Sequence, residues 1–423
     1  MIDVGYALDF LASQSTEALV RLFWFTLSLE IPRYACGFLA LGLAAASAER
    51  RAGHAPLAVR PTVSVTVVGH NEAGALERCL RSLREQTLPP TEVVVVSDGS
   101  SDGMAALAAR LVRQGLATHA LATDLRSGKS AGFNLALHNC RGDVVVNIDC
   151  DCSYDRFALE SIAAPFADPD VGAVSGDLAP RNGAMSLVAR LQEVEYLLSI
   201  SVGRRVAAGL NQVSCISGAF AAYRRVAVEQ VGGCDAGGGE DLDLTLRLRA
   251  AGWRVAFAPG AVCRTDVPVR LWTLVRQRLR WERDALRLRL RKHRRSLMGS
   301  ARRRTLAEAV HQWDFLIFEL GMTAVFPFYL AWLVSLYGGL ALPILVAMQL
   351  GLLLLDTALL SLAALIVQRS VPVSTLLYVP GYSVYSGWVM RPVRLVAYLQ
   401  EWFLFGSAHD NYVPAKVRLI RKW

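Results

Sequence analysis

The fold is decided by three short runs rich in β-branched residues: VSVTVV at 63–68, EVVVV at 92–96 and DVVVNI at 143–148. Helical patterns and one weaker strand separate them: helices near 103–114 and 129–139, and a strand near 118–122. Strands that alternate with helices of about this length indicate βαβ units. We therefore predict an α/β domain with a Rossmann-like, mixed and mostly parallel sheet.

Acidic residues follow two of these strands. Asp98 begins an Asp-Gly-Ser loop after the second run, and Asp149 and Asp151 follow the third. In parallel sheets, ligands bind at the carboxyl ends of the strands. Side chains at i and i+2 of an extended segment point the same way, so Asp149 and Asp151 are able to share one hard cation such as Mg²⁺. Each motif alone also suits an ordinary acidic turn.

Two further motifs open predicted helices. Lys129 follows Arg126-Ser127-Gly128 at a helix start, where backbone N–H groups favour anions; it is either a diphosphate ligand or a solvated loop lysine. Glu240 and Asp241 follow three glycines at the start of another helix. These carboxylates either offset the helix dipole or include a general base for an acceptor proton.

The positive charge of the chain is concentrated in one segment. The 423 residues include 45 Lys and Arg and 36 Asp and Glu, for a net charge of +9. Residues 276–304 hold 13 of the basic residues and only Glu282 and Asp284 as acidic ones, a net charge of +11, so the rest of the chain carries −2. Within this segment Gln277, Arg280 and Trp281 share one helical face.

This basic segment adjoins an apolar one, which favours a lipid bilayer over nucleic acid as its partner. Hydrophobic residues make up 53% of the chain and the mean hydropathy is +0.33, whereas about 45–50% is usual in soluble proteins. Residues 315–367 contain only Glu319 and Asp356 as charged residues. The stretch is long enough for two membrane spans of about 20 residues, with a break near Gly338-Gly339.

A second apolar stretch lies near the N-terminus. It predicts a span at about 32–48, and Glu30 and Arg33 are spaced to pair on a helix. Residues 374–408 are interrupted by glycine, proline and arginine, which suits a re-entrant or in-plane segment. Since positively charged flanks stay in the cytosol, we expect a multi-pass inner-membrane protein with a cytosolic catalytic domain. The predicted parts are an N-terminal membrane segment (1–50), the α/β domain (60–265), basic interfacial helices (266–310), C-terminal membrane segments (313–408) and a cytosolic tail (409–423).

Taken together, the motifs resemble those of the membrane-embedded, processive family 2 glycosyltransferases. This group includes hyaluronan, chitin-oligosaccharide, cellulose and poly-N-acetylglucosamine synthases. The resemblance covers about 61–281 and rests on four landmarks in the family's order: Asp98 in D-G-S, Asp149 and Asp151 in D-x-D, Glu240-Asp241 in E-D, and Gln277, Arg280 and Trp281 in Q-x-x-R-W.

The resemblance implies a GT-A-type domain that transfers sugar from UDP-N-acetylglucosamine or UDP-glucose to a growing β-linked glycan, with inversion. Asp241, beside Glu240, would be the general base, and Asp149 and Asp151 would hold Mg²⁺ or Mn²⁺. Nucleotide and diphosphate contacts would come from Asp98, Lys129, Asp149, Gln277 and Arg280. The acceptor would contact Trp281 and a loop at Ser217 and Gly218.

Two other functions remain open. One is a single transfer of sugar to a polyprenyl phosphate, although such enzymes generally lack a Q-x-x-R-W motif. The other is a non-catalytic polysaccharide export subunit. The short membrane portion also leaves open whether the chain translocates its product, forms a homo-oligomer or uses an export partner.

Overall fold

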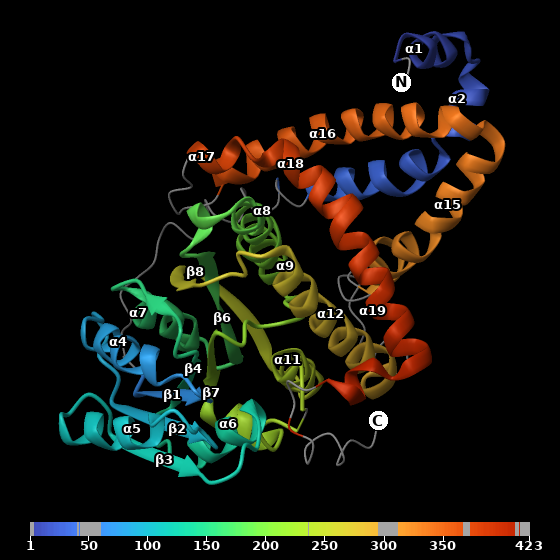
Figure 1. Ribbon diagram of the computed structural model, residues 1–423. Coiled ribbons are helices and arrows are strands. Elements are labelled where there is room, and N and C mark those ends of the chain that lie inside the picture. Colours follow the sequence, from blue (N-terminus) through green and yellow to red (C-terminus); the bar gives the residue numbers. More distant parts are fainter. Residues whose placement is uncertain are drawn as a thin grey trace.

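The computed structural model describes residues 4–39, 42, 61–235, 237–294, 312–366, 373–410 and 414. An α/β part contains all eight strands of the sheet, and a helical part combines segments from both ends of the chain (Figure 1). The N-terminal Phe25 and Tyr34 pack with Phe326, Tyr329 and Met348 in one apolar cluster. The two ends of the chain therefore fold together beside the α/β part.

The sheet has the strand order β3-β2-β1-β4-β7-β6-β8-β5. Its strands are β1 (Val63–Gly69), β2 (Glu92–Asp98), β3 (His119–Thr123), β4 (Val144–Ile148), β5 (Ser153–Tyr154), β6 (Val171–Pro180), β7 (Phe220–Arg224) and β8 (Arg254–Thr265). The four strands predicted from sequence are present and mutually parallel. Beyond β4 the sheet is mixed, because β7 lies antiparallel to both β4 and β6.

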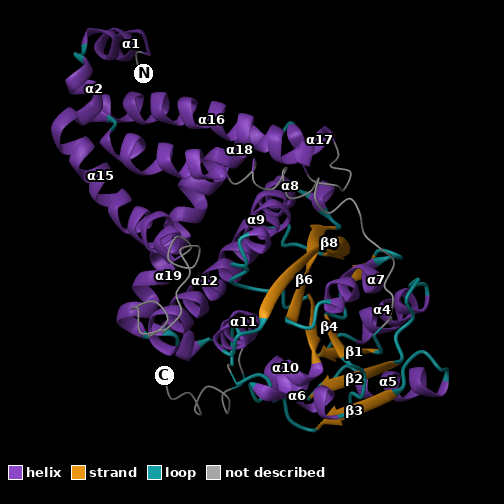
Figure 2. Ribbon diagram, turned by 180° about the vertical axis from the view of Figure 1, so that it is seen from behind, coloured by secondary structure: helices purple, strands orange, loops and turns teal. Residues whose placement is uncertain are grey.

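Helices cover both faces of the sheet (Figure 2). On one side are α4 (Ala73–Arg84), α5 (Met104–Arg113) and α7 (Ala158–Ala163); on the other are α6 (Lys129–His138), α10 (Arg225–Gln230) and α11 (Glu240–Ala250). Alternate residues of one strand enter opposite cores: Val93 and Val95 face the first group, and Val94 and Val96 the second. Burial on both faces explains why the strands are continuous apolar runs.

The helical part begins with α1 (Val4–Ser13), α2 (Thr16–Leu22) and the π-helix η1 (Thr26–Glu30). Between the strands and the C-terminal helices lie α8 (Leu187–Tyr196), α9 (Gly203–Gly209), α12 (Leu271–Arg287) and the π-helical η5 (Leu288–Lys292). The C-terminal helices are α15 (Met322–Tyr337), α16 (Ala341–Ile366), α17 (Val373–Leu376), α18 (Val379–Val384), η8 (Tyr385–Met390) and α19 (Arg391–Leu404).

Within the described residues one helical run, Gln312–Leu365, is long and apolar enough to cross a membrane, judged by length and composition. It turns at Gly338, whose φ of 50° lies in the left-handed region, close to the break predicted from sequence. The predicted span at 32–48 falls partly outside the described residues. Most of the basic residues beyond Arg294 and most of the predicted tail also lie outside them. In the stretch from 374 to 408, the short α17 is followed by α18, η8 and α19, which continue without a break from Val379 to Leu404.

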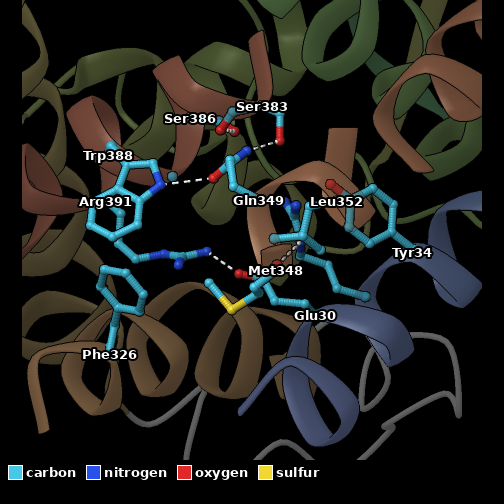
Figure 3. A pocket seen from close by; sticks show the side chains of 12 residues that line it. Glu30, Tyr34, Phe326, Met348, Gln349, Leu352, Ser383, Ser386, Trp388 and Arg391 are labelled. Atoms are coloured by element: carbon cyan, nitrogen blue, oxygen red, sulfur yellow. Dashed lines mark hydrogen bonds and ion pairs between the residues drawn. The ribbon is translucent and has the colours of Figure 1, made fainter. Parts of the chain in front are cut away.

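Polar side chains meet inside the helical part, as Figure 3 shows. Glu30 Oε2 lies 3.5 Å from Arg33 Nε, which confirms the predicted pair, and Arg391 joins Glu30 from α19. Nearby, Gln349 accepts a hydrogen bond from Trp388 Nε1 at 2.7 Å and donates one to a serine hydroxyl of α18. Charged groups among apolar helices are costly unless paired, and here they are paired.

Candidate active site

The strand-end residue Asp98 organises the loop that leads into α6. Its carboxylate is buried and accepts hydrogen bonds from the N–H groups of Ser127 at 2.6 Å and Gly128 at 2.7 Å. Gly99 has a φ of +59°, and a Cβ there would lie 2.3 Å from Arg126 N. Asp98 and Gly99 thus hold the 125–128 loop against the end of β2, which also fixes the start of α6.

Lys129, the first residue of α6, extends into a group of carboxylates. Its Nζ lies 2.6 Å from Asp149 Oδ1, 3.1 Å from the carbonyl oxygen of Gly218 and 4.0 Å from Glu240 Oε1. Asp149, Gly218 and Glu240 therefore surround Lys129, although they come from different parts of the chain. All four were predicted from the sequence to be site residues. The lysine charge balances anions that would otherwise repel one another.

Asp149 and Asp151 follow β4 as predicted, but they lie in a turn closed by a hydrogen bond from the Cys152 N–H to the Asp149 carbonyl, and not in the extended segment expected from the sequence. Burial raises the pKa of Asp151, and the neighbouring charge of Asp149 raises it further. This repulsion between two hard oxygen donors is what a divalent cation relieves, so the pair fits Mg²⁺ or Mn²⁺. Among the described residues no cluster of three or more His, Cys, Asp or Glu side chains is arranged to hold a metal.

A third carboxyl group, which the sequence analysis missed, lies behind this pair. Glu72 sits in the loop after β1. Burial, together with the charges of Asp149 and Asp151, raises its pKa to about 7, although a hydrogen bond with Cys150 opposes this rise. The signal available in the sequence was its position: the loop after β1 lies at the same sheet edge as the loops after β2 and β4.

Glu240 and Asp241 begin α11 directly after Gly239, whose φ of +67° lies in the left-handed region. Asp241 Oδ2 accepts a hydrogen bond from the N–H of Gly218 at 3.2 Å. Asp241 Oδ1 accepts another from the N–H of Leu242 at 2.8 Å. Burial raises the pKa of Glu240 to about 7, and the charge of Lys129 opposes this rise.

The peptide units around Gly218 connect the two carboxylate groups. The Gly218 N–H donates to Asp241, while its carbonyl accepts from Lys129 and, at 3.1 Å, from Asn147 Nδ2. The N–H of Ser217 donates to Ser175 Oγ. A Cβ at Gly218 would lie 3.2 Å from Asp241 Oδ2, so a larger residue would crowd the contact. Asn147 is the second site residue missed from sequence, because its role depends on a partner 71 residues away.

Helix α12 carries Gln277, Arg280 and Trp281. Asp284 lies on the same face as Arg280. It approaches the loop at residues 237–239, which we call the glycine loop, so closely that a Cβ at Gly238 would lie 2.6 Å from the Asp284 carboxylate. This contact turns the Gln277–Trp281 face of α12 toward the start of α11. The predicted roles of Gln277 and Arg280 therefore rest on their position on the helix.

Trp281 is held by an arginine outside the predicted motif. The guanidinium carbon of Arg278 lies 4.3 Å from the ring centroid of Trp281. Arg278 is buried, and it pairs with Glu195 at 2.8 Å, which also accepts a hydrogen bond from Tyr385. The indole of Trp281 remains 43% exposed. A fixed but exposed aromatic ring is well suited to stack against a ligand.

Comparison with known proteins identifies the family. Residues 61–283 match the family described as "Glycosyltransferase like family 2", which covers more than half of the chain. The chain belongs to glycosyltransferase family 2. The predicted resemblance is confirmed at the level of this family.

Similar curated proteins carry the name N-acetylglucosaminyltransferase. The protein of Azorhizobium caulinodans is 33% identical over 257 residues, which cover 56% of this chain and 64% of the relative. That of Rhizobium meliloti is 32% identical over 240 residues, covering 54% and 56%. The matched region thus spans less than two thirds of the length of either relative.

A solved structure is similar over most of this chain. The mannosyltransferase PcManGT from Pyrobaculum calidifontis, in complex with GDP-Man and Mn²⁺, aligns with a TM-score of 0.58 and 23% identity. The alignment covers 90% of this chain and 99% of the other. At this identity the likeness concerns the fold, and it supports the predicted GT-A-like architecture.

A buried ion cluster fixes α11 against the basic segment. Asp243 is fully buried and lies 2.8 Å from Arg247 Nε, Lys292 Nζ and His293 Nε2. Burial opposes ionisation of Asp243, but hydrogen bonds from His293 and Lys292 outweigh it and hold the pKa of Asp243 well below its usual range. Asp243 thus joins two helices, whereas its neighbour Asp241 faces the site.

We predict that Asp243→Asn lowers the free energy of unfolding by about 3 kcal/mol, because Arg247, Lys292 and His293 lose a buried anionic partner. Since the pKa is depressed in the folded state, this contribution is present above the ordinary aspartate pKa of about 3.9 and is lost as the pH falls further. Denaturant unfolding of the purified protein at several pH values measures both effects.

The matched control is Asp235→Asn. Asp235 also contacts Lys292 and Arg247, but its side chain is 46% exposed, so its loss should cost less than about 1 kcal/mol. Equal destabilisation by the two variants at neutral pH would contradict the assignment of Asp243 as the buried anchor.

Proposed function

We propose that the protein transfers sugar from a UDP-sugar to the growing end of a β-linked oligo- or polysaccharide, with inversion at the anomeric carbon. The observation that carries this proposal is the Gly218 contact. Its N–H holds Asp241 and its carbonyl holds Lys129, so a candidate base lies beside a candidate diphosphate site. The names of the relatives favour N-acetylglucosamine as the sugar over glucose.

On the donor side, the loop held by Asp98 would surround the nucleoside, and Lys129 would contact the diphosphate. Asp149 and Asp151 would hold Mg²⁺ or Mn²⁺. When bound, such an ion neutralises charge on the diphosphate leaving group. Gln277 and Arg280 would close over the diphosphate from α12, adding hydrogen bonds from a guanidinium, which suits phosphate oxygens.

On the acceptor side, Asp241 would remove the proton from the sugar hydroxyl. Each carboxylate oxygen has two lone pairs, so Asp241 keeps acceptor capacity beyond its two backbone hydrogen bonds. The hydroxyl oxygen attacks the anomeric carbon while the bond from that carbon to the UDP oxygen breaks, and UDP leaves with the electron pair. Glu240 would be the acidic neighbour of the base, and Ser217, Gly218 and Trp281 would position the acceptor.

We further propose that the reaction takes place at the cytosolic face of the inner membrane. Three features support this location: the apolar helical run Gln312–Leu365, the paired charges inside the helical part, and the basic α12 and η5 beside them. In this arrangement the α/β part lies in the cytosol, and the exposed ring of Trp281 lies on the helix that connects it to the membrane part.

The role of Asp241 is tested by Asp241→Asn. We expect the transfer rate to fall by at least about 100-fold, the usual contribution of a general base, while UDP binding stays within about twofold. Radiolabelled sugar transfer from UDP-N-acetylglucosamine and calorimetric titration with UDP measure the two quantities. Asp235→Asn is the control for a nearby exposed aspartate, and retained turnover in Asp241→Asn would remove this residue from the mechanism.

The role of Trp281 is tested by Trp281→Ala. If the ring stacks on the acceptor, elongation should fall about tenfold, which corresponds to about 1.4 kcal/mol, while hydrolysis of the UDP-sugar changes little. Product lengths by mass spectrometry and UDP release measure these activities. Trp272→Ala, at an exposed tryptophan earlier on α12, is the control; equal losses of elongation and hydrolysis in Trp281→Ala would indicate a structural tryptophan instead.

A further inference from the structure

Three helices meet at Arg278, the residue whose guanidinium lies over the Trp281 ring. Leu191 of α8, Leu274 of α12 and Tyr385 of η8 are buried in one apolar cluster. Leu274 lies one helical turn before Arg278 on α12. Helix α8 also packs beside α18, which leads directly into η8 (Figures 1 and 2). The C-terminal helices therefore reach the helix that carries the candidate acceptor residue.

A single carboxylate connects the three helices. Glu195 of α8 accepts a hydrogen bond from Arg278 Nη2 at 2.8 Å and another from the Tyr385 hydroxyl at 3.0 Å, both at its Oε2 atom. The guanidinium carbon of Arg278 in turn lies 4.3 Å from the ring centroid of Trp281. These contacts form one chain, which runs from η8 through α8 to the ring on α12. We call the four residues the Glu195 network.

Burial makes Arg278 depend on Glu195. The Arg278 side chain is buried, and its Nε has no hydrogen-bond partner in the part of the chain that the structure describes. Burial lowers the pKa of Arg278, but the charge of Glu195 outweighs this effect and holds the pKa above its ordinary value. Without that carboxylate the guanidinium would be an uncompensated buried charge. The long arginine side chain would then turn toward solvent and leave the Trp281 ring.

The ring of Trp281 needs this support because it is partly exposed. An exposed side chain moves among several rotamers, and 43% of Trp281 is exposed. A guanidinium within about 6 Å of the ring centroid attracts the ring face, so Arg278 favours the rotamer that covers it. A ring that is ordered before the acceptor arrives loses less conformational freedom on binding. The contact with Arg278 therefore prepares the ring for a ligand.

We propose that Glu195 and Tyr385 are positioning residues for sugar transfer. They hold the Arg278 guanidinium, which orients the ring of Trp281 for the acceptor sugar. This inference rests on the proposed role of Trp281 in acceptor binding, and it adds a physical link between the C-terminal helices and the acceptor. Because the Tyr385 hydroxyl belongs to η8, the position of that helix influences how the acceptor is held.

The kinetic test uses Glu195→Gln in the full-length protein. The KM for a short β-linked N-acetylglucosamine oligomer should rise about fivefold, which is the scale of ordering one side chain on binding, while the KM for UDP-N-acetylglucosamine stays within about twofold. Tyr385→Phe keeps the ring and removes one hydrogen bond, so it should raise the acceptor KM by about twofold. An equal rise for donor and acceptor in Glu195→Gln, or no rise at all, would overturn the proposal.

The matched control is Glu193→Gln. Glu193 lies on the same helix, pairs with Arg190 at 2.9 Å and accepts a hydrogen bond from the Thr375 hydroxyl of α17 at 2.9 Å. It thus joins α8 to the C-terminal helices as Glu195 does, but its arginine lies over the ring of Tyr378. Glu193→Gln should keep the acceptor KM of the wild type. An equal rise in both variants would show that loss of any ion pair on α8 has this effect, and the proposal would be wrong.

A double-mutant cycle shows whether Glu195 acts through the indole. In the Trp281→Ala background, Glu195→Gln should have no further effect on the acceptor KM, because the ring that Glu195 positions is absent. Effects of the two substitutions that simply add would mean that Glu195 reaches the acceptor by another route, which contradicts the proposal.

A spectroscopic measurement follows the ring itself and does not depend on activity. In protein labelled with 5-fluorotryptophan, the fluorine resonance that disappears in Trp281→Phe identifies this ring. Glu195→Gln should shift or broaden that resonance, whereas Glu193→Gln should not, and the other tryptophan resonances report whether each variant is folded. An unchanged resonance in Glu195→Gln would refute the link. If the resonance moves but Trp281→Ala leaves the acceptor KM unchanged, the link to the ring holds and the proposed acceptor role of Trp281 is wrong.

Discussion

The arrangement of the site depends on the buried contact between α11 and the basic segment. Asp243 belongs to a helix whose Leu244 and Leu248 pack in the core beside the sheet, whereas Lys292 and His293 belong to the end of η5. Breaking a buried ion cluster is expensive, yet forming one contributes little net stability. The ion cluster therefore matters mainly for geometry. It fixes the position of α12 relative to Asp241, and with it the positions of Gln277, Arg280 and Trp281.

Within this frame the Gly218 peptide units connect the donor and acceptor sides. Lys129 interacts with Asp149 and lies near Glu240, so part of the negative charge of the site is already offset without substrate. Such an arrangement is preorganised, because polar groups that are fixed in advance do not have to reorient when charge develops. Glycine at 218 permits the close approach, since a side chain would press on Asp241.

The sequence predicts the first half of the sheet better than the second. The runs at 63–68, 92–96 and 143–148 are buried on both faces, so their composition alone marks them as strands. Pairing of β6 with β7 and β8 joins segments far apart in the chain and has no local signature. The strand-end rule likewise finds Asp98 and Asp149, but it gives no information on Asn147 or Arg278, whose roles come from distant partners.

The basic segment shows most clearly why charge counts alone are insufficient. From sequence, its net charge of +11 describes a cationic surface beside a membrane. In the structure Arg278 and Arg287 are buried and hold Trp281 and the glycine loop, whereas Arg294 is exposed. A buried guanidinium needs specific acceptors, while an exposed one interacts only through a screened field. The same run of arginines therefore combines buried residues that hold the candidate site with exposed residues on the surface.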